Sequence, residues 1–103
     1  MNERLHVLIV EDNPADVDLM RDALPETGPI RFHSESVPRL SEALARLATG
    51  GIDLVMTDLG LPDSRGLATF RTLRQAAPDL AIIVLTGNDD QANDQIGGRQ
   101  IMH

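Results

Sequence analysis

Four short runs of the chain are rich in apolar residues, at residues 5–10, 30–34, 52–56 and 81–85. The first run is almost continuously apolar and rich in β-branched residues, which is typical of a strand buried on both faces of a parallel sheet. In the second run apolar and polar residues alternate, as they do in an edge strand. We therefore predict four strands, of which the second lies at an edge of the sheet.

Helical patterns connect these strands, because apolar residues recur there every three or four positions. Asn13 or Asp12 is placed to cap the first helix and Ser36 the second, and Gly50-Gly51 is a typical C-terminal stop. Gly66 opens the third helix, which ends before Pro78. The predicted apolar stripes consist of Val17, Met20 and Leu24, of Leu40, Ala43, Leu44 and Leu47, and of Leu67, Phe70 and Leu73.

Strands that alternate with helices through short connections predict an α/β fold with a parallel sheet, right-handed crossovers and helices on both faces. With 103 residues, a single domain is expected. The alternation stops after the fourth strand. Asp89-Asp90 could begin a fourth helix, but residues 93–103 show neither a helical stripe nor a strand pattern, and we predict an atypical tail there.

Composition narrows the possible partners. Sixteen acidic and nine basic residues give a net charge of −7, which argues against direct binding to nucleic acid or to an anionic membrane surface. The chain has no Cys, which fits a reducing cytoplasm, and its first apolar run is too short for a signal peptide or a membrane span. All nine basic residues are Arg, so the chain contains no Lys.

Polar residues follow the predicted strands at their carboxyl ends. Glu11 and Asp12 come after the first strand, Asp58 ends the third, and Thr86 follows the fourth. In a doubly wound sheet, ligands bind at this edge, where the strand order reverses. If the first and third strands are neighbours, three carboxylates meet there and repel each other. A hard divalent cation such as Mg²⁺ relieves that repulsion and leaves positions open for phosphate oxygens.

The same arrangement makes Asp58 a candidate nucleophile. Its carboxylate could attack a phosphoryl donor to form an acyl phosphate, while the hydroxyl of Thr86 donates a hydrogen bond to a phosphoryl oxygen. Each residue also has a simpler interpretation. Asp12 could serve only as a helix cap, Asp58 could be a solvated loop carboxylate, and Thr86 could be a turn hydroxyl. Their joint placement at the strand ends favours the functional interpretation.

Three segments together resemble the receiver domains of bacterial response regulators, in order and in spacing. They are Leu8-Ile9-Val10-Glu11-Asp12-Asn13, the segment from Asp58 to Gly66, and Ile83-Val84-Leu85-Thr86-Gly87. The resemblance covers about residues 5–92 of the single, incomplete domain at 1–103, with 93–103 as the atypical tail. It implies a flavodoxin-like doubly wound sheet with strand order 2-1-3-4.

The resemblance also implies a role for each site residue. Asp58 would be phosphorylated by a histidine kinase or a histidine phosphotransfer protein, and Thr86 would contact the phosphoryl group and switch the conformation. Asp12 would bind Mg²⁺ directly, Glu11 would act mainly through water, and the carbonyl of Gly60 would be a further ligand. Such a domain catalyses only its own phosphorylation and dephosphorylation, so we do not expect an enzyme.

The chain departs from the family pattern at its C-terminal end. Receivers carry a Lys at the end of a fifth strand, where it pairs with the phosphoryl group, and a fifth helix follows. Here the Lys is absent, and we expect the fifth strand and fifth helix to be missing. A fragment, an altered reading frame or a natural variant would each explain this. The fourth strand, residues 81–85, would then be an exposed apolar edge, which predicts self-association through it.

The sequence also allows two other functions. A degenerate receiver that acts only as a protein-interaction module is favoured by the missing Lys. A phosphohydrolase of the haloacid dehalogenase type would also use an aspartyl phosphate, but it needs a second Asp two positions after the nucleophile, where this chain has Gly60. His6, His33 and His103 are scattered along the chain and are not expected to be metal ligands.

Overall fold

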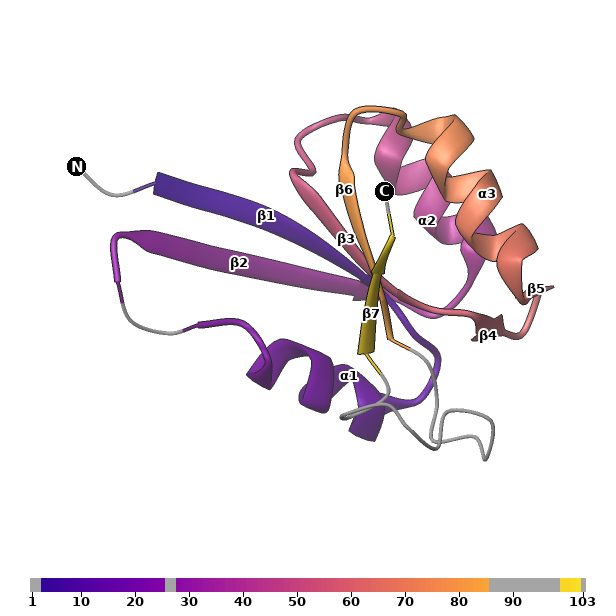
Figure 1. Cartoon of the computed structure of the whole chain (residues 1–103), viewed down its shortest axis with the longest axis horizontal. Coiled ribbons are helices and arrows are strands. Elements are labelled where there is room, and N and C mark those ends of the chain that lie inside the picture. The colour runs from indigo at the N-terminus through magenta and orange to yellow at the C-terminus, as the bar shows by residue number, and fades with distance from the viewer. Residues whose placement is uncertain (1–2, 26–27, 86–98, 103) are drawn as a thin grey trace.

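A five-stranded sheet with helices on both faces forms the body of the chain (Figure 1). The structure, a computed structural model, describes residues 3–25, 28–85 and 99–102. The strand order is β2-β1-β3-β6-β7. The strands are β1 (Glu3–Val10), β2 (Ile30–Val37), β3 (Leu54–Asp58), β6 (Ala81–Leu85) and β7 (Arg99–Met102), and the helices are α1 (Pro14–Asp22), α2 (Leu40–Ala48) and α3 (Leu67–Ala76).

The first four strands of the sheet are parallel and confirm the predicted order 2-1-3-4. β2 is the edge strand that the alternating pattern of residues 30–34 predicted. Its burial alternates along most of its length. The fold is therefore the flavodoxin-like α/β fold expected from the sequence.

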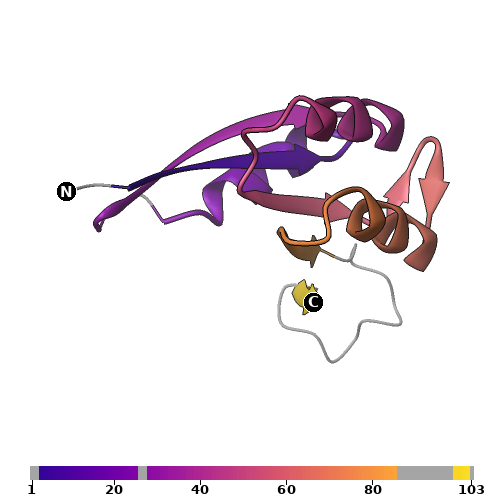
Figure 2. The same ribbon diagram turned by 90° about the horizontal axis from the view of Figure 1, so that it is seen from above.

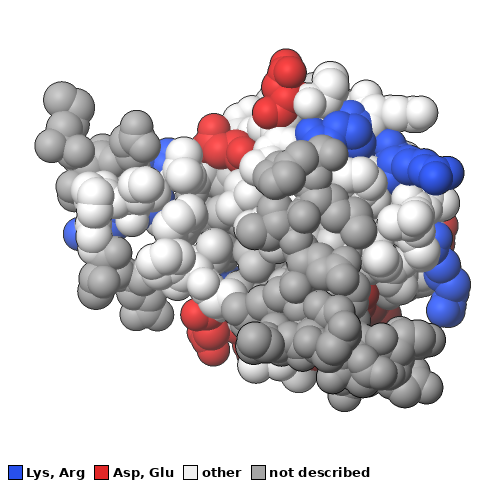
Figure 3. All heavy atoms as spheres, in the orientation of Figure 1, with Lys and Arg blue, Asp and Glu red and all other residues white. Residues whose placement is uncertain are grey.

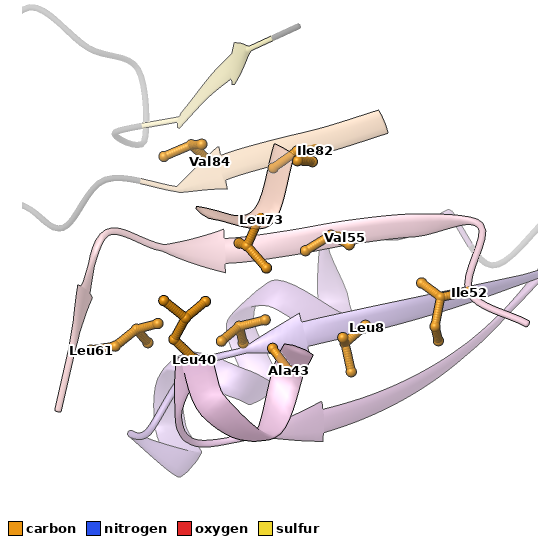
Figure 4. Packing of buried hydrophobic residues seen from close by; sticks show 10 residues of the cluster. Leu8, Leu40, Ala43, Ile52, Val55, Leu61, Leu73, Ile82 and Val84 are labelled. Carbon is orange, nitrogen blue, oxygen red and sulfur yellow. The ribbon is translucent and has the colours of Figure 1, made fainter. Parts of the chain in front are cut away.

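Two apolar clusters cover the two faces of the sheet. Alternate residues of β1 belong to different clusters, since Val7 and Ile9 pack with α1 and Leu8 and Val10 pack with the α2 and α3 side. Figure 1 and Figure 2 show α1 on one side of the sheet and α2 with α3 on the other. The cluster on the α2 and α3 side, shown in Figure 4, consists of Leu8, Val10, Leu40, Ala43, Ile52, Val55, Leu61, Leu73, Ile82 and Val84.

The helix ends agree with the sequence at three points and differ at one. Asn13 caps α1 by accepting a hydrogen bond from the Ala15 amide at 2.9 Å, and Gly50 and Gly51 follow α2 with φ of 81° and 88°. Gly66, with φ 68°, precedes α3. The predicted capping of the second helix by Ser36 is wrong. Ser36 lies inside β2, because pairing with β1 continues as far as Val10 and Val37.

The segment 59–65, which links β3 to α3, contains a short hairpin. β4 (Gly60–Leu61) pairs antiparallel with β5 (Ser64–Arg65), and Pro62-Asp63 form the turn between them. The side chain of Leu61 is only 1% exposed, which explains why this polar-looking segment is ordered against the core. Leu67, predicted in the apolar stripe of α3, is instead 49% exposed at the first position of the helix.

The prediction that residues 93–103 form no strand is wrong for residues 99–102. These residues form β7, which pairs antiparallel with β6 from Ile82 and Met102 to Leu85 and Arg99. An unpaired strand edge offers backbone donors and acceptors to any extended segment. Here β7 is the segment that pairs with the edge of β6. The expected self-association through an exposed fourth strand therefore loses its basis, because β6 has a neighbour on both sides.

Within the described ranges, none of the helices has the length and hydrophobicity needed to cross a membrane.

The core on the α2 and α3 side predicts a large effect of truncating Leu8, which is fully buried. Leu8→Ala should lower the free energy of unfolding by about 2–5 kcal/mol, because it removes buried methyl groups and leaves a cavity. The matched control is Leu19→Ala on α1, where the side chain is 63% exposed. That change should cost about 0.5 kcal/mol or less. Urea unfolding followed by circular dichroism measures both, and equal losses would contradict the assigned packing.

Candidate functional site

Acidic side chains from two neighbouring strands meet at the carboxyl edge of the sheet. Glu11 and Asp12 directly follow β1, and Asp58 is the last residue of β3. β1 and β3 are paired up to Val10 and Thr57, so Glu11 and Asp58 stand at the same level on adjacent strands. The prediction that the first and third strands are neighbours is thus confirmed, and the carboxylates that follow them share one edge.

Glu11 is the buried member of this group, with 5% of its surface exposed. Its amide donates a hydrogen bond to the Val37 carbonyl at 2.9 Å, which fixes the backbone against the end of β2. Its carboxylate accepts a hydrogen bond from the Asn13 amide at 3.0 Å. These two bonds hold the side chain at the sheet edge rather than in solvent.

Burial raises the pKa of Glu11 to about 7, although the hydrogen bond from the Asn13 amide acts in the opposite direction. The carboxyls of Asp58 and Asp12 also raise this pKa, which means that both lie close to Glu11. Carboxylates that repel each other in a partly buried site hold a proton or attract a cation. The negative charge at this edge therefore favours a bound proton or cation.

Asp58 is partly buried and oriented by its own loop. Its Oδ1 accepts a hydrogen bond from the Gly60 amide at 3.1 Å, and its carbonyl accepts one from the Thr57 hydroxyl at 2.8 Å. Thr57 itself is fully buried. The short bridge between Asp58 and Gly60 keeps the Gly60 backbone next to the carboxylate, as a ligand role for both residues would require.

The acidic side chains do not form a complete metal cage. Among residues 4–25 and 28–85, whose side chains the structure describes, no three acidic or histidine side chains are gathered closely enough to hold a metal ion by themselves.

Three residues predicted near this edge of the sheet follow β6 in the sequence. Thr86 and the Asp89-Asp90 pair lie outside the described residues. The end of β6 is nevertheless at the site, because Leu85 is level with Asp58 in the sheet. The next strand adds a residue that the sequence did not point to. Arg99, the first residue of β7, is level with Leu85, so a basic residue begins a strand at this acidic edge.

Charge is unevenly distributed around the site. α1 carries Asp16, Asp18 and Asp22, whereas β5 and α3 carry Arg65, Arg71 and Arg74 and no acidic residue. Figure 3 shows basic side chains gathered on the side of the molecule that α3 forms. An anionic ligand would therefore meet less repulsion on the α3 side than on the α1 side.

The fold is a flavodoxin-like α/β fold with acidic residues at the carboxyl edge of its parallel strands, and comparison with known proteins identifies its family. Residues 7–98 match the family model described as the response regulator receiver domain. The chain belongs to this family, which serves in two-component signalling and typically binds Mg²⁺.

Relatives of known name are similar over most of the chain. The KDP operon transcriptional regulatory protein KdpE of Escherichia coli is 38% identical over 88 residues, which are 85% of this chain and 37% of that protein. The swarming motility regulation protein RssB of Serratia marcescens is 34% identical over 82% of this chain and 37% of its own length. The chain thus spans little more than a third of these relatives.

Solved structures show the same fold. A sensor protein from Polaromonas has a TM-score of 0.69 at 31% identity, covering 89% of this chain and 73% of that one. The MaeR response regulator bound to beryllium trifluoride has a TM-score of 0.68 at 28% identity, covering 90% of this chain and 77% of that one.

The raised pKa of Glu11 predicts that the metal-free protein loses stability as the pH rises. Glu11 has a pKa of about 7 in the folded chain and 4.5 as its ordinary value. Between these values the folded state binds more protons than the unfolded state, so the free energy of unfolding falls with rising pH and levels off above pH 7. The expected loss is on the order of 2 kcal/mol.

Thermal unfolding between pH 4.5 and 8 in chelator measures this slope. Glu11→Gln should remove most of it, whereas Glu42→Gln, an exposed position on α2, should keep it. An unchanged slope in Glu11→Gln would show that another group is responsible. Mg²⁺ should restore stability to the wild-type protein at pH 8 more than at pH 5, because it binds the ionised carboxylates.

Proposed function

We propose that this receiver domain is a phosphoacceptor switch, in which Asp58 takes a phosphoryl group from a histidine kinase or a histidine phosphotransfer protein. The observation that carries the proposal is the position of Glu11 and Asp58 on adjacent strands, close enough for Asp58 to raise the pKa of Glu11. The resemblance to receivers within transcriptional regulators and within the sensor histidine kinase RcsC of Salmonella typhimurium supports the same role.

In the proposed reaction a carboxylate oxygen of Asp58 attacks the phosphorus of a phosphohistidine. The new bond joins that oxygen to phosphorus, the bond from phosphorus to the imidazole nitrogen breaks, and this nitrogen keeps the electron pair. The Gly60 amide, bound to Asp58 Oδ1, fixes the orientation of the carboxylate. The hydroxyl of Thr86, which follows β6 in the sequence, is proposed to donate a hydrogen bond to the transferred group.

Mg²⁺ would be held by Asp12, Asp58 and the Gly60 carbonyl, with Glu11 acting mainly through a bound water. The ion would offset the negative charge of the phosphoryl oxygens. The chain's own contribution is to keep these oxygen ligands together despite their mutual repulsion. The domain would catalyse only its own phosphorylation and dephosphorylation, in the cytoplasm.

The absence of Lys supports a second candidate function. Without the family's Lys, the phosphoryl group would lack one ion-pair partner, and the domain would act as a phosphorylation-independent interaction module. We favour the phosphoacceptor function, because Glu11 directly follows β1 and Asp58 ends β3, and these two strands are neighbours in the sheet.

Phosphorylation can be tested directly with acetyl phosphate and Mg²⁺. Intact mass spectrometry should show one added phosphate on the wild-type protein and none on Asp58→Asn, because the variant lacks the nucleophilic carboxylate. Chelation of Mg²⁺ should prevent the modification of the wild-type protein as well.

Asp79→Asn is the matched control, since Asp79 is exposed and precedes β6 at the opposite edge of the sheet. It should be phosphorylated like the wild type. A folded wild-type sample that takes up no phosphate would support the interaction module instead, and phosphate retained in Asp58→Asn would place the acceptor elsewhere.

A further inference from the structure

The N-terminus of α2 is capped by a residue from a distant hairpin. Arg39, at the N-cap position, makes no side-chain hydrogen bond to the helix. Instead, Asp63 Oδ1 accepts a hydrogen bond from the Leu40 amide at 2.8 Å, and its Oδ2 accepts one from the Ser41 amide at 3.0 Å. Both oxygens of one carboxylate thus satisfy the first two amides of α2, which would otherwise have no partner within the helix.

This contact is electrostatically favourable. The carboxylate of Asp63 lies at the positive end of the helix dipole. The hydrogen bonds from the Ser41 and Leu40 amides hold the pKa of Asp63 below its usual range, so the cap stays charged at neutral pH. Asp63 forms the turn of the β4–β5 hairpin, which therefore docks by its tip onto α2.

The base of the same hairpin lies at the proposed phosphorylation site. Gly60, the first residue of β4, donates its amide hydrogen bond to Asp58 Oδ1 and pairs with Arg65. Leu61 comes next and is buried in the cluster that also contains Leu40, as Figure 4 shows. The backbone between Asp58 and Asp63 thus runs from the site to the helix cap within five residues of sequence.

α3 fixes the other side of this segment. The Gly66 amide donates to the Leu59 carbonyl at 2.9 Å, and the Thr69 hydroxyl donates to the same carbonyl at 3.3 Å. The hydroxyls of Ser64 and Thr69 share a hydrogen bond of 2.6 Å, and Thr69 is fully buried. The hairpin is therefore held at its base by α3 and at its tip by α2.

We propose that Asp63 is a positioning residue of the phosphorylation site, which holds the Gly60 carbonyl beside Asp58 by tying the hairpin tip to α2. The proposal rests on the proposed function and deepens it. A residue within the chain next to α2 could cap that helix equally well. Capping from the hairpin additionally restrains the loop that carries a metal ligand, as supporting contacts do around other metal sites.

The two roles of Asp63 can be separated by moving the cap. Asp63→Ala removes both the cap of α2 and the restraint on the hairpin. The double variant Arg39→Asp with Asp63→Ala puts a capping carboxylate at the helix's own N-cap position, whose φ of −136° and ψ of 154° suit a cap residue. Thermal stability should fall in the single variant and largely return in the double variant.

The Mg²⁺ affinity then shows whether Asp63 is only a helix cap or also a positioning residue. Isothermal titration calorimetry with Mg²⁺ should show about tenfold weaker binding in Asp63→Ala and the same loss in the double variant, although its helix is capped again. Asp63→Asn keeps one acceptor oxygen and should lie between wild type and Asp63→Ala. If the double variant binds Mg²⁺ as tightly as the wild type, Asp63 is only a helix cap and the proposal is wrong.

Amide hydrogen exchange in the metal-free protein gives a readout that does not depend on the proposed function. In the double variant the Leu40 and Ser41 amides should regain protection while the Gly60 amide stays exposed to exchange. If the Gly60 amide of the double variant is as well protected as in the wild-type protein, the proposal is wrong. A different result separates the two proposals. If the wild-type protein binds no Mg²⁺ and the Gly60 amide still loses protection in the variants, the phosphoacceptor function is wrong and the positioning role of Asp63 remains.

Discussion

The repulsion between carboxylates that two adjacent parallel strands bring together is the constraint on which this molecule depends. β1 and β3 pair because their apolar residues are buried on both faces of the sheet, and this pairing leaves Glu11 and Asp58 side by side where the strands end. Hydrophobic burial thus assembles a site that is unfavourable by itself. Repulsion of this kind favours a bound cation, as the proposed phosphoacceptor function requires.

The support around this edge comes from loops rather than from the strands. Asn13 binds the carboxylate of Glu11 through its amide and caps α1 with its side chain, so one residue serves both the site and the helix. On the other side, the backbone of Gly60 orients Asp58. The loops after β1 and β3 therefore define the geometry of the acidic group, while the sheet defines which residues meet.

Local patterns in the sequence were sufficient for the parallel strands, for the edge position of β2 and for the placement of Glu11 and Asp58 at the ends of adjacent strands, because burial and strand order follow from periodicity. They failed where a long-range contact decided the outcome. β7 exists because β6 offers a partner, which no periodicity in residues 99–102 reveals. Ser36 was expected to cap α2, but it pairs with β1 as part of β2. The carboxylate of Asp63, 23 residues beyond Leu40, caps the helix instead. The one sequence feature that could have indicated a cap from elsewhere is Arg39, because Arg is not a typical N-cap residue.

The distant cap of α2 also has a consequence for how the chain folds. α2 is nine residues long, and isolated helices of this length are marginal in water. Its first amides find their partner only after the hairpin beyond β3 has formed, so during synthesis the helix emerges before the residue that completes it. We therefore infer that α2 gains its full stability only when the β4–β5 hairpin has formed, although the hairpin follows it in the chain.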